Sequence, residues 1–136
     1  MFLLDTSVVS ELRRRQAAPS VVAWAKSIAL PSLFLSAITV EEIEIGVMLA
    51  ERRDPRQGAS LRAWLENQIL TSFTERILPV DVAVARRSAA IHVPDPRPIR
   101  DGLIAATALV HGLTVATRNT ADFDPTGART FNPWVS

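Results

Sequence analysis

Short apolar runs alternate with longer stretches of helical periodicity along this chain. The apolar runs are bounded by polar turns and predict strands at 2–4, 33–35, 77–80, 113–117 and 130–131. Apolar residues at helical spacing predict helices at 8–15, 20–29, 39–53, 57–73, 82–91 and 101–111. Strands that alternate with helices form a parallel sheet covered on both faces. We therefore predict an α/β fold, a three-layer α/β/α sandwich with a central, mostly parallel sheet, built as a single domain by residues 1–136.

The segment from 101 to 123 organises the rest of the chain. Asp101 is followed by a run without charge that ends at His111, and this run predicts a helix that is buried on nearly all sides. Gly112 predicts the end of that helix. The next strand is short, apolar and β-branched, as buried parallel strands are, and Asp122 follows it in a loop. One acid thus begins a core helix and another lies beyond the C-terminal end of a core strand, the edge at which open α/β sheets bind ligands.

Two further acids occupy comparable positions, and each has a structural alternative. Asp5 follows the first strand and could cap the next helix, although Thr6 and Ser7 are also good N-caps. Glu42 forms a capping-box pattern with Thr39, in which the glutamate would reach back to the N-cap amide. On a helical wheel, however, Glu42 lies apart from the other acids of its helix and beside a glycine. The sequence leaves both interpretations of Glu42 open.

The other two acids also have structural alternatives, but all four acids together are expected at one edge of the sheet. Asp101 could simply favour the helix dipole, and Asp122 could be a turn residue. Parallel topology would nevertheless bring all four strand-end and helix-start acids to one edge. Carboxylates that converge repel one another and need a cation to remain ionised. Mg²⁺ or Mn²⁺ is the natural partner, and such a site activates water and stabilises charge on a phosphodiester.

Composition excludes several other classes of site. The chain has no cysteine, so disulfides and thiolate metal sites are ruled out. With His92 and His111 as its only histidines, the sequence does not favour a zinc site. The net charge is +1, so nucleic-acid binding cannot be inferred from bulk charge, although Lys26 is the only lysine among 15 basic residues and arginine forks onto phosphate. The start MFLLD lacks a basic signal-peptide region, and no apolar run is long enough to span a membrane. We therefore expect a cytoplasmic protein without membrane association.

Four segments, in order and at this spacing, resemble the PIN-domain ribonucleases, and specifically the VapC-type toxins of bacterial and archaeal toxin–antitoxin pairs. The segments are LLDTSVVSEL, LSAITVEEIEIGV, DGLIAATALVHGLTVATRNTADF and the FNPW tail. The resemblance spans nearly the whole chain and implies a PIN-like fold. It also implies a metal-dependent endoribonuclease that leaves a 5′-phosphate and a 3′-hydroxyl.

The resemblance assigns roles to particular residues. It implies that Asp5, Asp101 and Asp122 bind Mg²⁺ or Mn²⁺, and that Glu42 completes the acidic metal site and orients or deprotonates the attacking water. Three polar residues match positions that support the acids. Thr6 matches a hydroxyl that commonly supports the first aspartate. Thr117 and Asn119 match the polar strand end that positions the last acid.

The resemblance also implies partners. It implies an RNA substrate, a homodimer, and a cognate antitoxin bound in a groove near the first helices, to which Val21, Val22, Trp24 and Ile28 could contribute unless they pack in the core. The arginines nearest the acidic edge are candidate contacts to the RNA backbone, and solvated surface residues are the alternative for each. They are Arg97, Arg100 and Arg118.

Other classes of protein fit less well. A receiver domain would need a late lysine, and an aspartyl-phosphate hydrolase would need an acid where Ser7 stands. A non-catalytic RNA- or protein-binding module of the same fold, in which the acids act only as caps, stays open from the sequence.

Overall fold

The computed structural model describes residues 1–135, in which five strands form one sheet in the order β3-β2-β1-β4-β5. Every neighbouring pair in this sheet is parallel. The strands are β1 (Phe2–Leu4), β2 (Leu33–Ser36), β3 (Ile77–Leu78), β4 (Thr114–Ala116) and β5 (Thr130–Phe131). The predicted α/β class with a parallel sheet is confirmed.

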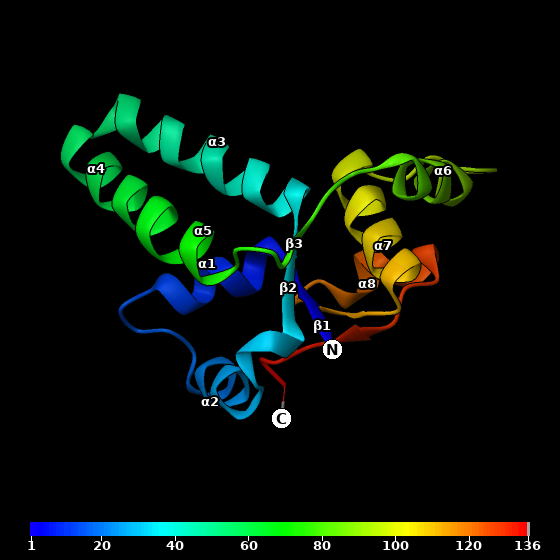
Figure 1. Cartoon of the computed structure of the whole chain (residues 1–136), viewed down its shortest axis with the longest axis horizontal. Helices are drawn as coiled ribbons and strands as arrows, with labels where there is room; N and C mark the ends of the chain where they lie inside the picture. Colours follow the sequence, from blue (N-terminus) through cyan, green and yellow to red (C-terminus); the bar gives the residue numbers. More distant parts are fainter. Residues whose placement is uncertain (136) are drawn as a thin grey trace.

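Helices cover both faces of the sheet (Figure 1). The α-helices are α1 (Thr6–Arg13), α2 (Pro19–Ser27), α3 (Ala37–Arg53), α4 (Pro55–Trp64), α5 (Leu70–Ser72), α6 (Val82–Ile91), α7 (Ile99–His111) and α8 (Thr120–Phe123). Short 3₁₀ turns occur at η1 (Leu30–Ser32) and η3 (Asp124–Thr126), and a π-helical turn, η2 (Leu65–Ile69), joins α4 to α5. In Figure 1, α1 to α5 lie on one side of the strands and α6 to α8 on the other.

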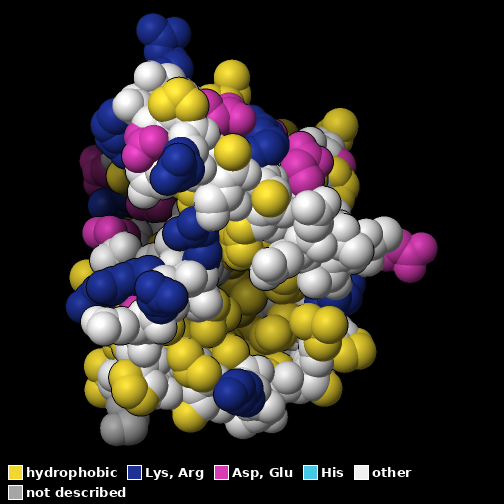
Figure 2. Space-filling view, turned by 90° about the vertical axis from the view of Figure 1, so that its left-hand side faces the viewer, with side chains coloured by type: hydrophobic (Ala, Val, Ile, Leu, Met, Phe, Trp, Pro, Cys, Tyr) yellow, Lys and Arg dark blue, Asp and Glu magenta, His cyan; other side chains and the backbone are white. Residues whose placement is uncertain are grey.

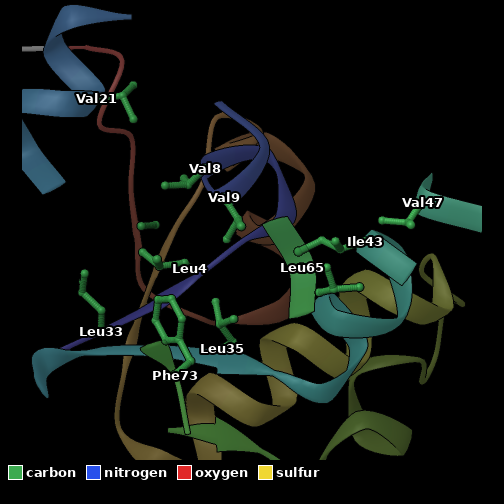
Figure 3. Packing of buried hydrophobic residues seen from close by; sticks show 11 residues of the cluster. Leu4, Val8, Val9, Val21, Leu33, Leu35, Ile43, Val47, Leu65 and Phe73 are labelled. Atoms are coloured by element: carbon green, nitrogen blue, oxygen red, sulfur yellow. The ribbon is translucent and has the colours of Figure 1, made fainter. Parts of the chain in front are cut away.

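Adjacent leucines of β1 show how the sheet separates two cores. Leu3 packs with the side chains of α7 and β4, whereas Leu4 packs with those of α1 and β2. Both are at most 2% exposed, because successive side chains of a strand point to opposite faces and here both faces are covered. Figure 3 shows the cluster around Leu4, to which α3 contributes Ile43 and Val47.

Several helices begin before the predicted positions, because caps other than the predicted ones are used. Ser36, the last residue of β2, caps α3 by accepting a hydrogen bond from the Ile38 amide, so this helix begins at Ala37 rather than at 39. Asp54 caps α4 in the same way, and Pro55 occupies the first helical position. The predicted helix 57–73 is therefore a longer segment, interrupted by the π-helical turn.

The predicted core helix is α7, which begins at Ile99 and not at Asp101. Its residues Ile104, Ala105 and Ala108 are fully buried, although Val110 is 40% exposed. Gly112 follows with φ +67°, the left-handed conformation that ends many helices, as predicted. Within residues 1–135, every helix is too short or too polar to cross a bilayer.

Candidate functional site

Asp5 stands at the C-terminal end of the central strand β1, with a side chain that is only 7% exposed. It occupies the N-cap position of α1 but makes no capping bond with its side chain. Its Oδ2 instead accepts hydrogen bonds from the hydroxyl groups of Thr117, at 2.8 Å, and Ser7, at 2.9 Å. The capping alternative for Asp5 is therefore wrong, and so is the prediction that Thr6 or Ser7 caps α1.

Glu42 lies in the second turn of α3 and faces the same edge of the sheet. Its Oε1 accepts a hydrogen bond of 2.6 Å from the Thr6 hydroxyl, and its Oε2 is 3.8 Å from the Arg100 guanidinium. The capping box with Thr39 does not form, because Ser36 caps the helix and Thr39 is buried within it. Thr6 supports Glu42 and not Asp5, which corrects the role expected for this hydroxyl.

Asp101 lies in the first turn of α7, and three other acids act on it electrostatically. Burial of the Asp101 carboxyl is the largest cause of a pKa raised above its ordinary value. The next causes, in decreasing order, are the negative charges of Asp5, Asp122 and Glu42. The other three predicted acids therefore lie near enough to Asp101 for their charges to disfavour its ionised form.

Asp122 lies beyond the end of β4, as predicted, but in the short helix α8 rather than in a loop. The amide of Asp122 bonds to the carbonyl oxygen of Asn119 at 3.0 Å, and the Asn119 amide bonds to the Thr117 hydroxyl at 3.0 Å. Thr117 is fully buried and donates to Asp5. One threonine therefore connects the strand-end acid Asp5 to the turn that carries Asp122.

Ser7 is a component of the site that the sequence did not assign. Besides donating to Asp5, its Oγ accepts from the Arg118 amide at 3.4 Å, so it joins α1 to the segment after β4. The only signal for it was its place in Asp5-Thr6-Ser7, where hydroxyl residues also serve as caps. Sequence alone could not distinguish the two uses.

The three candidate arginines lie in different surroundings. Within the described residues, Arg100 is the one of the three that forms an ion pair, with Glu42. The guanidinium of Arg118 lies 5.3 Å from the centre of the Trp134 ring. The backbone amide of Arg97 donates to His92 Nδ1 at 3.0 Å.

The donors that converge here are all oxygens, which is the chemistry that a hard divalent cation selects. Four carboxylates beside hydroxyl groups fit Mg²⁺ or Mn²⁺ in donor type. In residues 1–135, however, no three acidic or histidine side chains are drawn together closely enough to form a preassembled metal cage. The histidines take no part, since His111 is exposed in the last turn of α7 and His92 accepts a backbone bond.

Two depressions lie against α1. A small cleft of about 250 Å³ opens beside Glu42 and Thr6, between α1, α3 and α4; we refer to it as the Glu42 cleft. A larger apolar groove of about 400 Å³ is lined by Leu12, Val22 and Phe73, among other residues. Figure 2 shows hollowed hydrophobic surface on the side of the molecule that carries α2 and α4.

Comparisons with known proteins agree with this architecture. Residues 2–127 match the family model of the PIN domain. "Toxin FitB" of Neisseria gonorrhoeae is 45% identical over 98% of this chain and 99% of its own length. "VapC ribonuclease Y4jK" of Sinorhizobium fredii is 36% identical over 98% of each protein.

Solved structures give the same result. The crystal structure of FitAcB from Neisseria gonorrhoeae matches with a TM-score of 0.92 at 43% identity, over 100% of both chains. A toxin–antitoxin complex from Klebsiella pneumoniae matches with a TM-score of 0.69 at 27% identity, over 98% of both chains. The chain belongs to the PIN-domain family.

Proposed function

We propose that this protein is a metal-dependent endoribonuclease that acts as the toxin of a toxin–antitoxin pair. The names of its relatives, a toxin and a VapC ribonuclease, support this class of activity. The observation that supports the proposal most directly is the set of charges around Asp101: burial and the negative charges of Asp5, Asp122 and Glu42 raise the pKa of its carboxyl, and a bound cation would offset that repulsion.

Each acid has a separate role in the proposed reaction. Asp5, Asp101 and Asp122 hold the divalent cation, Mg²⁺ or Mn²⁺, directly or through water. The bound cation supplies positive charge against the phosphate oxygens and lowers the pKa of water. Glu42 orients the attacking water or accepts its proton, and the Thr6 hydroxyl fixes the direction of its carboxylate. Hydrolysis leaves a 5′-phosphate and a 3′-hydroxyl.

The test is cleavage of total RNA by purified, antitoxin-free protein in Mg²⁺, in Mn²⁺ and in EDTA. We expect discrete fragments with a metal, none in EDTA, and none from Asp5→Asn. Glu41→Gln is the matched control, because Glu41 is an exposed acid on the same helix as Glu42. This variant should cleave RNA like the wild type. No cleavage in either metal by folded protein would favour the alternative, a non-catalytic RNA- or protein-binding module.

Arginines around the acids would hold the RNA backbone. Arg100 is the best supported by position, because its guanidinium lies 3.8 Å from the Glu42 carboxylate and can turn to a phosphate. Arg97 and Arg118 are further candidates. Charge reversal of Arg97 and Arg100 should weaken RNA binding and flatten its salt dependence. An unchanged salt dependence would reject this role.

The apolar groove is where we propose that the antitoxin binds, and we also propose a homodimer. Of the four residues expected to line such a groove, only Val22 does so among the described residues. Val21 is fully buried, and Trp24 packs on Phe2 and Phe131 with ring centroids 5.0 and 5.5 Å apart. Val22→Glu should therefore weaken antitoxin binding more than Trp24→Phe does, in a co-purification assay with folded variants.

A further inference from the structure

The Glu42 cleft is part of the acidic site and yet is not an acidic surface. Glu42 and Thr6 form one end of it, α3 and α4 line the remainder with apolar side chains that include Ile43 and Trp64, and α1 adds Ser10 and Arg13. A group bound in this cleft would therefore lie directly beside the carboxylate that we assign to the attacking water. Its volume of about 250 Å³ is below the range of roughly 300–1,000 Å³ that is usual for pockets of drug-sized ligands. It suits one compact ring better than a peptide segment.

Gly46 leaves the floor of the cleft open. It lies on α3, one turn beyond Glu42, and it is exposed. A Cβ built at this position meets no atom within 4 Å. Glycine is unfavourable within a helix compared with alanine, and no steric conflict here requires it. The absence of a side chain therefore has one visible effect, which is to keep the cleft unfilled.

The walls of the cleft provide the two kinds of contact by which proteins recognise unpaired bases of RNA. Bases stack on aromatic rings and on arginine planes, and their edges form hydrogen bonds with polar side chains. Trp64 lines the cleft, and the Arg13 guanidinium lies 5.7 Å from the centre of its ring. Ser10 contributes an exposed hydroxyl on the next turn of α1 after Thr6.

We propose that the Glu42 cleft binds one nucleobase next to the scissile phosphate and so sets the nucleotide preference of cleavage. This inference rests on the proposed ribonuclease function. The base stacks against Trp64 and Arg13, above the open surface at Gly46, and Ser10 reads its edge. Its phosphate then lies at the acids, because Glu42 and Thr6 belong to both the cleft and the acidic site.

The experiment compares Gly46→Leu with Met48→Leu. The first variant places an isobutyl group in the cleft. The second places the same group on the opposite side of α3, about 200° away, where Met48 is 55% exposed. Ser10→Ala is an additional variant that removes only an exposed hydroxyl. Melting temperatures confirm that each variant is folded.

Cleavage of an RNA pool with a randomised sequence, followed by sequencing of the fragment ends, gives the nucleotide preference. We expect the wild type to prefer one nucleotide at a fixed position beside the cut. Gly46→Leu should lower kcat/KM for the preferred sequence by about tenfold or more, as expected for loss of a base-stacking contact, and should flatten the preference. Met48→Leu should leave both unchanged, and Ser10→Ala should shift the preference with a smaller loss of rate.

A second readout does not require activity. Short oligoribonucleotides that differ in one base should quench tryptophan emission to different extents in EDTA, and Gly46→Leu should remove that difference. If quenching depends on the base but the protein cleaves no RNA in Mg²⁺ or Mn²⁺, the proposed ribonuclease function is wrong while base binding in the cleft still holds.

Two results would overturn the proposal while leaving the ribonuclease function intact. The first is cleavage by the wild type without any nucleotide preference. The second is a Gly46→Leu variant that keeps the wild-type preference; if that variant also loses antitoxin affinity, the cleft belongs to the protein-binding surface.

Discussion

The hydroxyl of Thr117 is a sensitive point of the site, and Thr117→Val should be costly although the two side chains have nearly the same shape. Thr117 is fully buried, donates to Asp5 Oδ2 at 2.8 Å, and accepts from the Asn119 amide at 3.0 Å. Valine fills the same space and can make neither bond. The substitution therefore isolates the loss of hydrogen bonding from any change in packing.

The expected magnitude follows from these two bonds. A hydrogen bond to a charged group contributes roughly 1.5–3 kcal/mol, and an amide left without its partner adds about 1 kcal/mol. The free energy of unfolding should therefore fall by roughly 2.5–4 kcal/mol. For a chain of this size the melting temperature should fall by roughly 3–4 °C per kcal/mol, or about 8–16 °C. Cleavage should slow by about ten- to hundredfold, because Asp5 loses a group that orients it.

Thr126→Val is the matched control. Thr126 is also buried, and its hydroxyl likewise donates one bond and accepts one, but its acceptor is the neutral carbonyl oxygen of Phe123. This variant should lose less stability and keep full cleavage activity. Urea unfolding in EDTA measures both losses without any contribution from a bound metal.

A double-mutant cycle with Asp5→Ala tests the cause. If the bond between Thr117 and Asp5 carries most of the effect, Thr117→Val should cost at most about 1 kcal/mol once Asp5 is absent. An equal cost in both backgrounds would refute the reasoning. So would a Thr117→Val protein that is as stable as the wild type.

Three further predictions concern charge and packing. Since the pKa of Asp101 is raised, its ionised carboxyl opposes folding at neutral pH. Asp101→Asn should therefore raise the melting temperature in EDTA and abolish any further rise that Mg²⁺ produces in the wild type; a lower melting temperature in EDTA would contradict this. The pKa of Glu11 is lowered from 4.5, first by the hydrogen bond that its carboxylate accepts from the Ala18 amide, so the ionised carboxylate stabilises the fold at neutral pH and this stabilisation is lost as the pH falls below 4.5. Glu11→Gln should therefore lose less stability than the wild type between neutral and acidic pH, and parallel curves of stability against pH would exclude the effect. A Cβ at Gly58 would lie 2.4 Å from the Cα of Glu51, so Gly58→Ala should destabilise the protein by roughly 1–3 kcal/mol or more. Gly46→Ala, where a Cβ meets no neighbour, should instead stabilise it by up to about 1 kcal/mol, and equal effects of the two variants in thermal unfolding would disprove the close approach of α3 and α4.

The positions of the strand-end acids in the fold could be predicted from the sequence because they follow from topology. Asp5 and Asp122 lie at or beyond the C-terminal ends of the neighbouring strands β1 and β4, and parallel pairing of Phe2 with Thr114 brings those ends together. Apolar runs were sufficient to find these strands, because parallel strands buried on both faces are apolar throughout. The raised pKa of Asp101 agrees with the predicted convergence.

The hydrogen-bond partners of the acids could not be predicted, because the same residue types serve as caps and as supports. Ser36 and Thr39 are both good N-cap residues, and a local pattern with Glu42 favoured Thr39. The structure uses Ser36, since the chain leaves β2 there, and Glu42 then bonds to Thr6 from another helix. The partner of Glu42 is therefore set by a contact between α1 and α3, which no pattern of neighbouring residues in the sequence can show.

The strand order also determines when the site can exist during synthesis of the chain. β1 emerges first, yet its partner β4 emerges only after most of the chain has been made. Thr117, which fixes Asp5, and the turn with Asp122 arrive later still. A growing or truncated chain that lacks the segment after β4 therefore carries Asp5 and Glu42 without these partners, and the set of acids is complete only once Asp122 has been made.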